Sequence, residues 1–275
     1  MSGKPATMDD PYILVLLAST TGAQECLEIA ATMGRSLGQP LRLLHVQVGP
    51  GSLVLPTQEH LSEYEVEHLG EREQKETDVL VDLVADWSRH SGISAPLEVV
   101  TGDEWRALRP HRTRASLVIL ASPHTQPIGH RETLRAALLR AGHPVVMIPP
   151  GWHNSFGRRL LIGWQDVPPL RRAVVAFGAF LSRAEQVTVV AVQQDETALA
   201  EARRSLEGLT PGAIYRTVAA EGRKTAAVLL EEARQAEADG IVMGAYRRGE
   251  ILNWLMPGTS TRLIQDTTIP LLMSP

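Results

Sequence analysis

The sequence repeats one pattern of apolar runs and helical segments in its two halves. The first half begins with YILVLLA from Tyr12, the second with RLLIGW from Arg159, and a helical pattern follows each run. Each half closes on an apolar run with proline, HPVVMIP from His143 and IPLLMSP from Ile269. An internal repeat of this kind requires each copy to form a similar structure. We therefore predict two related domains, residues 1–150 and 156–275, joined through the Pro- and Gly-rich stretch 149–159.

The order of the segments within each copy indicates the fold class. Runs such as ILVLLA and LVILA are apolar at every position, which is typical of strands covered by helices on both faces. Between them, apolar residues recur every three or four positions, as at Ala137, Leu138 and Ala141. Strands that alternate with helices predict βαβ units and a parallel sheet, so the expected class is α/β. Residues 49–92 form an insertion that has only a shorter counterpart in the second half.

Composition excludes several classes of protein. The net charge of −4 gives no basic excess for nucleic acid, and no apolar run is long enough to span a membrane. The single cysteine, Cys26, excludes an internal disulfide and a zinc site built mainly from cysteines. The polar start of the chain shows no signal peptide, so a soluble cytoplasmic protein is expected.

The last segment, MGAYRRGEILNWLMPGTSTRLIQDTTIPLLMSP, together with the strand pattern from Tyr12 to Pro275, resembles the universal stress protein family in its tandem form. The resemblance implies two doubly wound, mostly parallel five-stranded sheets, one for each domain. It also implies that the domains associate through their last strands, as an intramolecular pseudo-dimer. Some members of the family hold ATP at the carboxyl ends of the strands, and others bind no nucleotide.

The loop before the last helix fits an anion seat. Small residues let backbone N–H groups approach phosphate oxygens, and a following helix N-terminus adds free donors. Gly258, Thr259 and Ser260 stand at that position. The alternative, given about equal weight, is that these residues only cap the helix.

Matched position by position, the loop departs from the family pattern. Gly244 matches the first glycine, but Arg247 replaces the second, and Pro257 stands where the third is expected. Proline has no N–H to donate. Arg247 and Arg248 could instead offer guanidinium groups to an anion, although two solvated loop arginines are the preferred interpretation.

The adenine side of the family site maps onto two further positions of the second half. Gln165 replaces the acidic residue of the family pattern, and Asp166 follows it, so Asp166 can serve only after a small shift in register. The backbone group that touches the base falls near Val192. In the first half, Ala18 and Ala121 occupy the corresponding acidic and glycine positions, so we expect that half to be a non-binding partner.

The sequence patterns and the family resemblance together predict one function, and two alternatives remain open. We expect a non-enzymatic stress-response or regulatory protein with at most a weakened site for ATP or another nucleotide in the C-terminal domain. The alternatives are a protein that acts by interaction alone and a slow ATP hydrolase, for which no convincing Mg²⁺ carboxylate besides Asp166 is present. Copies of the chain could also form a homo-oligomer, and no nucleic-acid or membrane partner is expected.

Overall fold

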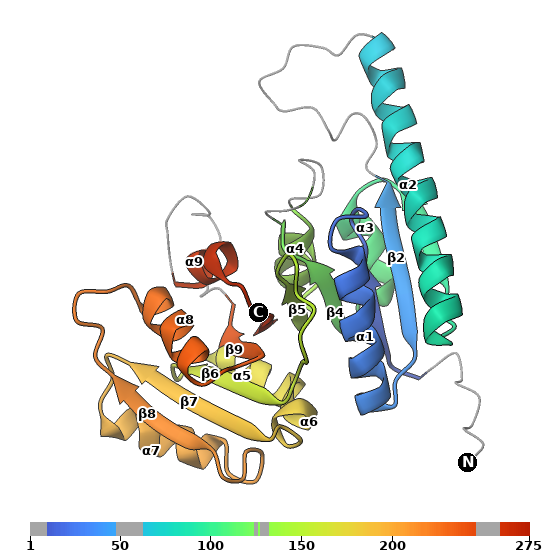
Figure 1. Ribbon diagram of the computed structural model, residues 1–275. Coiled ribbons are helices and arrows are strands. Elements are labelled where there is room, and N and C mark those ends of the chain that lie inside the picture. The colour runs from blue at the N-terminus through green and yellow to red at the C-terminus, as the bar shows by residue number, and fades with distance from the viewer. Residues whose placement is uncertain (1–9, 48–62, 124–125, 127–131, 246–258) are drawn as a thin grey trace, which may run out of the picture. The chain divides into compact units, whose positions relative to one another are not determined.

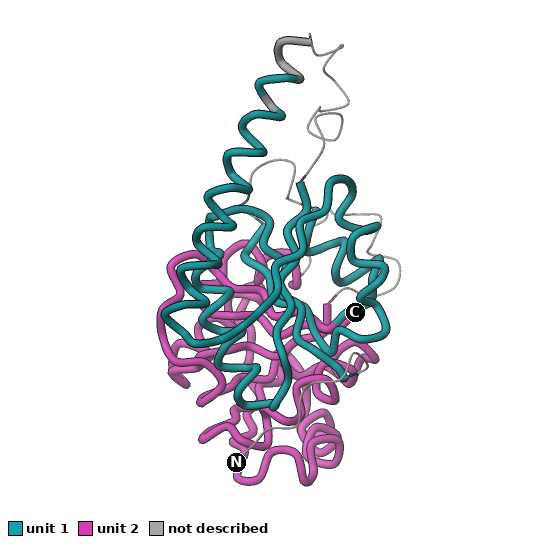
Figure 2. The backbone as a smooth tube through the Cα atoms, turned by 90° about the vertical axis from the view of Figure 1, so that its right-hand side faces the viewer, with its two compact units in different colours: residues 1–143 teal, residues 144–275 magenta. Residues whose placement is uncertain are grey.

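The computed structural model describes residues 10–47, 63–123, 126, 132–245 and 259–275. The chain forms two compact units, unit 1 (residues 1–143) and unit 2 (residues 144–275), shown in Figure 2. Both contain strands that alternate with helices, as the sequence predicts.

Unit 1 begins with a buried strand, and its helices follow the strands in the expected order. The long helix α2 lies within the insertion of residues 49–92. The elements are β1 (Tyr12–Leu16), α1 (Ala23–Leu37), β2 (Leu41–Gln47), α2 (Glu63–Ser91), β3 (Leu97–Thr101), α3 (Glu104–Leu108), a 3-10 turn (Arg109–His111), β4 (Ala115–Ala121), α4 (Thr133–Arg135) and a π-helical turn (Ala136–Arg140).

The strands of unit 1 pair in the order β3-β2-β1-β4, and all of these pairs are parallel. Every residue of β1 is buried, which explains the uninterrupted apolar run YILVL. The order reverses between β1 and β4, so the carboxyl ends of these strands form the edge at which doubly wound sheets generally bind ligands.

Unit 2 repeats this arrangement. Its elements are β5 (Val145–Ile148), β6 (Arg159–Trp164), α5 (Pro168–Ala176), α6 (Gly178–Leu181), β7 (Gln186–Val192), α7 (Glu196–Ser205), β8 (Ile214–Val218), α8 (Thr225–Gln235), β9 (Gly240–Gly244), α9 (Thr259–Asp266) and β10 (Leu271–Ser274). Strands β8, β7, β6, β9 and β10 are neighbours in this order, and their pairs are parallel. Helices α8 and α9 pack together on one face of the sheet, and α7 covers the other (Figure 1).

The predicted pairing of the two proline-containing strands is confirmed. β5 lies antiparallel to β10, with Val146 opposite Leu272. β5 lies in unit 2, and the boundary between the units falls between residues 143 and 144, before the stretch 149–159 in which it was predicted. The pairing covers the edge of β10, which would otherwise expose unpaired backbone groups.

Candidate functional site

The carboxyl edge of unit 2 brings together three residues that were predicted from the sequence. Val192 ends β7 and Gly244 ends β9, while Asp166 follows β6 by two residues. These three strands are parallel neighbours, so their last residues lie along one edge of the sheet. The edge is therefore the candidate functional site.

Asp166 is engaged by a neighbouring arginine. Arg171 of α5 donates from Nε to Oδ1 over 2.6 Å and from Nη2 to Oδ2 over 2.8 Å. This hydrogen-bonded guanidinium holds the pKa of Asp166 below its usual range, so the carboxylate is ionised at neutral pH. Both groups reach solvent, with 60% of the Arg171 side chain and 33% of the Asp166 side chain exposed. A ligand that contacts Asp166 would have to compete with this pair.

The start of α5 offers few donors to an anion. Val167 precedes the helix without a side-chain cap, and Pro168 and Pro169 occupy its first two positions. Proline has no N–H, so two of the groups that a helix N-terminus normally presents are missing here. The helix begins at the carboxyl edge but is a poor anion seat.

Gly244 is required by packing against this same helix. A Cβ atom at position 244 would lie 2.7 Å from the backbone nitrogen of Leu170 and 3.0 Å from Cβ of Pro169. Both distances are shorter than ordinary van der Waals contacts, and one of them involves the backbone. The glycine that matches the family pattern is thus explained by the approach of α5 to β9, with or without a ligand.

The end of β7 is closed by glutamine residues. Gln193 has a positive φ of 53°, and its N–H donates to the carbonyl of Val218 over 2.9 Å. Gln194 donates from Nε2 to the carbonyl of Trp164 over 3.5 Å. Val192 and Trp164 are buried, so Trp164 has a core position and does not lie open for stacking on a ligand.

The remaining predicted residues lie at or before the start of α9. Thr259 is exposed and Ser260 is half-buried in the first turn of this helix. Arg247, Arg248 and Gly258 lie outside the described residues. The structure thus places Thr259 and Ser260 at a helix start, as expected for either a cap or an anion seat.

The corresponding edge of unit 1 is occupied by side chains of the chain itself. Both the backbone N–H and the hydroxyl of Thr20 donate to Oε1 of Glu76 in α2, over 2.8 and 2.7 Å. The hydroxyl of Ser19 donates to Oε1 of Gln126 over 2.8 Å, and Nε2 of Gln126 donates to the carbonyl of Thr21 over 3.0 Å. The turn after β1 is therefore satisfied internally.

A buried histidine extends this polar network of unit 1. Nδ1 of His45 donates to the carbonyl of Leu17 over 2.7 Å, and Nε2 lies 3.0 Å from the hydroxyl of Thr77. Sequence reasoning did not identify this network. The available signals were His45 within the largely apolar strand LRLLHV and the polar residues Glu76 and Thr77 on the face of α2 that also carries Leu80.

The described residues form neither a metal site nor a membrane-spanning helix. Within the described ranges, no three histidine, cysteine or acidic residues gather in a way that could hold a metal ion. Across the same part of the chain, every helix is too short or too polar to cross a membrane. Cys26 is buried, and burial raises the pKa of its thiol far above the usual value, so the thiol is unreactive.

Comparison with known proteins identifies a family for part of the chain. The model of the universal stress protein family matches residues 173–275. A universal stress protein from Archaeoglobus fulgidus shares the fold with a TM-score of 0.65 and 16% identity, and the match covers 94% of each chain. A protein of unknown function from Pseudomonas aeruginosa matches with a TM-score of 0.58 and 15% identity, over 96% of this chain and 92% of that chain. No curated protein matches the sequence.

The predicted resemblance to universal stress proteins is confirmed. The matched residues 173–275 fall within unit 2, which holds the candidate site. The α/β class and the mostly parallel sheet are confirmed as well, and two full-length matches have this fold. At identities this low, the solved structures show the fold alone.

Proposed function

We propose that the whole chain is a tandem universal stress protein that acts in regulation of a stress response without catalysing a reaction. Unit 2 alone would retain a weak site for ATP or another nucleotide. One observation carries this proposal: side chains far along the chain hold the turn after β1 in unit 1, whereas among the described residues the turn after β6 in unit 2 is held by a local, exposed ion pair.

In unit 1, a ligand would have to displace bonded groups. The carboxylate of Glu76 accepts both donors of Thr20, and Gln126 joins Ser19 to Thr21. Leaving these groups unpaired costs free energy, and a triphosphate would meet the negative charge of Glu76. Both effects oppose nucleotide binding and support a non-binding role for unit 1.

In unit 2, the turn after β6 is held by an exposed ion pair. Arg171 binds Asp166 at the surface, where such pairs contribute little and can rearrange. The first turn of α9 adds Thr259 and Ser260. Donors are nevertheless fewer than in a full phosphate site, since Pro168 and Pro169 begin α5. We therefore expect weak binding.

A thermal-shift titration with ATP, ADP and AMP, with and without Mg²⁺, tests this function. A ligand that binds only the folded state stabilises it by about 1.4 kcal/mol at ten times its dissociation constant, enough to raise the melting temperature by a few degrees. The combined variant Thr259→Ala and Ser260→Ala should reduce the shift, and Ser205→Ala, on the exposed surface of α7, should leave it unchanged.

Each negative result has a distinct meaning. No shift at saturating nucleotide would favour a protein that acts by interaction alone. Phosphate release from ATP in proportion to protein concentration would contradict the non-enzymatic role and favour the hydrolase. We also expect the protein to act in the cytoplasm, which localisation of the full-length protein in cells can check.

A further inference from the structure

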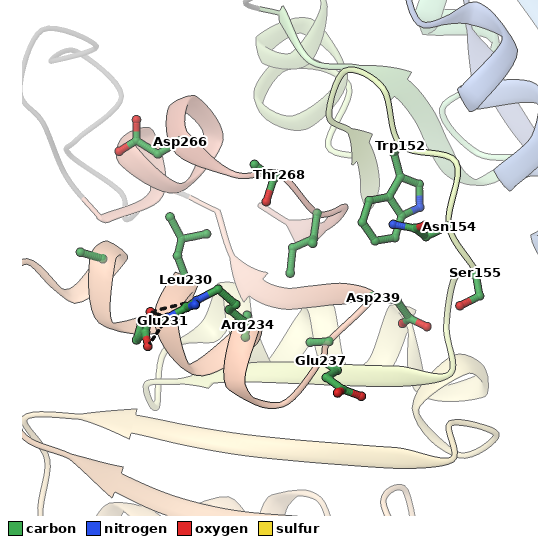
Figure 3. Close-up of a pocket in the computed structure, with 14 residues that line it drawn as sticks. Trp152, Asn154, Ser155, Leu230, Glu231, Arg234, Glu237, Asp239, Asp266 and Thr268 are labelled. Carbon is green, nitrogen blue, oxygen red and sulfur yellow. Dashed lines mark hydrogen bonds and ion pairs between the residues drawn. The ribbon is translucent and has the colours of Figure 1, made fainter.

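Unit 2 contains an open cleft of about 760 Å³ at the amino edge of its sheet (Figure 3). Asp239 precedes β9 and Ile269 precedes β10, and both line this cleft. The candidate nucleotide site lies at the other end of the same strands. The five residues of β9 separate the two edges by about 15 Å, so the cleft is a separate site.

Part of the lining of the cleft is apolar. Trp152 of the segment between β5 and β6, Leu230 of α8 and Ile269 all line it. Trp152 lies on one side and α8 on the other (Figure 3). The Trp152 residue is only 8% exposed, and its indole N–H has no hydrogen-bond partner among the described residues. Such a wall favours a ligand with an apolar body that fits beside the aromatic ring.

The charged residues of the cleft are mostly acidic. Its lining contains four carboxylates and one guanidinium, and they belong to Glu231, Glu237, Asp239, Asp266 and Arg234. Nη2 of Arg234 lies 2.7 Å from both oxygens of Glu231, so these two charges offset each other, and Glu237 is offset in the same way by Arg159. Among the described residues, Asp239 and Asp266 have no cationic partner. The potential in the cleft is therefore negative, which favours cations and disfavours anions.

Three of the carboxylates have partners within unit 2. Asp239 accepts backbone N–H groups of residues 157, 158 and 159, and Glu237 pairs with Arg159. These contacts hold the wall of the cleft in place. Asp266 is exposed and forms no ion pair with any described residue.

The position of Asp266 adds an independent argument. It is the last residue of α9, and the last turn of this helix has no basic residue. The C-terminus of a helix carries a partial negative charge, which makes a carboxylate unfavourable there. Helix α8 also ends beside the cleft, at Gln235. Two negative helix ends and an exposed carboxylate thus lie around the apolar part of the lining, and a bound cation would relieve the repulsion.

We propose that this cleft binds a small organic cation, namely a protonated amine on an aromatic or alkyl body. The apolar body packs between Trp152 and Leu230, and the ammonium group lies toward Asp266. An ammonium near the indole ring is also attracted to its face. A nucleotide is excluded from the cleft by the same negative charges that favour the amine.

An NMR titration of the ¹⁵N-labelled full chain tests the proposal. Phenethylamine is the probe, with 2-phenylethanol and 3-phenylpropionate as neutral and anionic analogues of similar size. The indole N–H signal of Trp152, identified by its loss in Trp152→Phe, should shift and saturate with the amine at several-fold lower concentration than with either analogue. A shift that does not saturate, or equal binding of the anion, would overturn the proposal.

Matched variants locate the binding site. Ala227 is an exposed residue of α8 that lines the cleft, and Ala227→Trp should fill the cleft and abolish binding. Ala200→Trp, on the exposed face of α7, is the control and should leave the affinity unchanged. Asp266→Asn should weaken the amine about two- to five-fold, the size of an exposed charge pair, whereas Asp82→Asn on α2 should not. Unchanged affinity in Ala227→Trp would show that the amine binds elsewhere.

Discussion

The two units solve one packing problem in opposite ways, at the ends of β4 and β9. In unit 1, β4 ends with Ala121, and the facing residue before α1 is Gly22, where an added Cβ would lie 2.8 Å from Cβ of Ala121. In unit 2, β9 ends with Gly244, and the facing residues are Pro169 and Leu170 of α5. The first helix approaches the strand so closely that only one partner can carry a side chain. A glycine that matches a binding motif can therefore have a packing role.

The units also differ in how they satisfy the turn after their first strand. Unit 1 uses Glu76 and Gln126, which lie far along the chain, and unit 2 uses Arg171, five residues after Asp166. Long-range side-chain bonds hold the turn of unit 1, whereas the turn of unit 2 is held by an exposed local pair, with one longer bond of 3.5 Å from Gln194 to the carbonyl of Trp164. This difference is the basis for assigning ligand binding to unit 2.

The largest expected effect comes from Gly244→Ala. The added methyl group would collide with the backbone of Leu170 and with Pro169, so α5 or β9 must shift. We expect a loss of about 3 kcal/mol in the free energy of unfolding, measured by urea denaturation.

Gly70→Ala is the matched control for this change. Gly70 lies within α2, and an added Cβ would meet no atom within 4 Å. Alanine should therefore stabilise the helix by up to about 1 kcal/mol. If Gly244→Ala did not lower the free energy of unfolding, Gly244 would not be required for packing against α5. A role for Gly244 in ligand binding would then be favoured.

The second effect is a loss of stability between pH 7 and pH 5, which we expect to be larger in unit 1 than in unit 2. His45, His111 and His143 are buried in unit 1, whereas the single histidine of unit 2, His153, is exposed. Burial, aided by the charges of His111 and Arg112, lowers the pKa of His143 to about 4. The unfolded state binds a proton near pH 6.5 and the folded state only near pH 4, so stability is lost as pH falls between these values.

The free energy of unfolding, measured at pH 7 and at pH 5, tests whether stability falls as the pH is lowered. We expect unit 1 to lose about 2 kcal/mol through His143 over this interval. His143→Gln cannot be protonated and should flatten the pH dependence, and His153→Gln should not change it. Hydrogen exchange resolved by residue would separate the units, and an earlier loss of protection in unit 2 at pH 5 would contradict the prediction.

A smaller effect is expected from opening the edge of unit 1. Glu76→Ala leaves the N–H and hydroxyl of Thr20 without their acceptor, which should cost about 1–2 kcal/mol, and Glu76→Gln should cost less because one oxygen remains. Glu67→Ala, at an exposed position of α2, is the control. Urea denaturation measures the change, and equal effects of Glu76→Ala and Glu67→Ala would show that Glu76 does not close the edge.

The smallest effect is expected from Asp166→Asn. The ion pair with Arg171 lies at the surface and is screened by salt. The melting temperature should change little, and the small change should vanish in 0.5 M NaCl. A large loss of stability that did not depend on salt would mean that Asp166 stabilises the turn after β6 as strongly as Glu76 stabilises the turn after β1.

The sequence predicted most of the fold and part of the candidate site. The apolar runs at Tyr12 and Arg159 predicted β1 and β6, because burial of a central strand on both faces is visible in the sequence. The pairing of β5 with β10 was also predicted, through the family resemblance. The partner of Asp166 was not predicted, since nothing in the sequence shows that Arg171 turns back toward the strand end.

The sequence by itself determined the duplicated α/β pattern, because apolar periodicity is a local property and each copy carries it completely. Only the tertiary structure decided which residues are free to meet a ligand. The contact of Glu76 with Thr20 spans 56 residues, and the cleft draws its walls from several separate segments. Contacts of this kind depend on where each helix ends and on which side chains then lie side by side. A local sequence pattern does not contain this information.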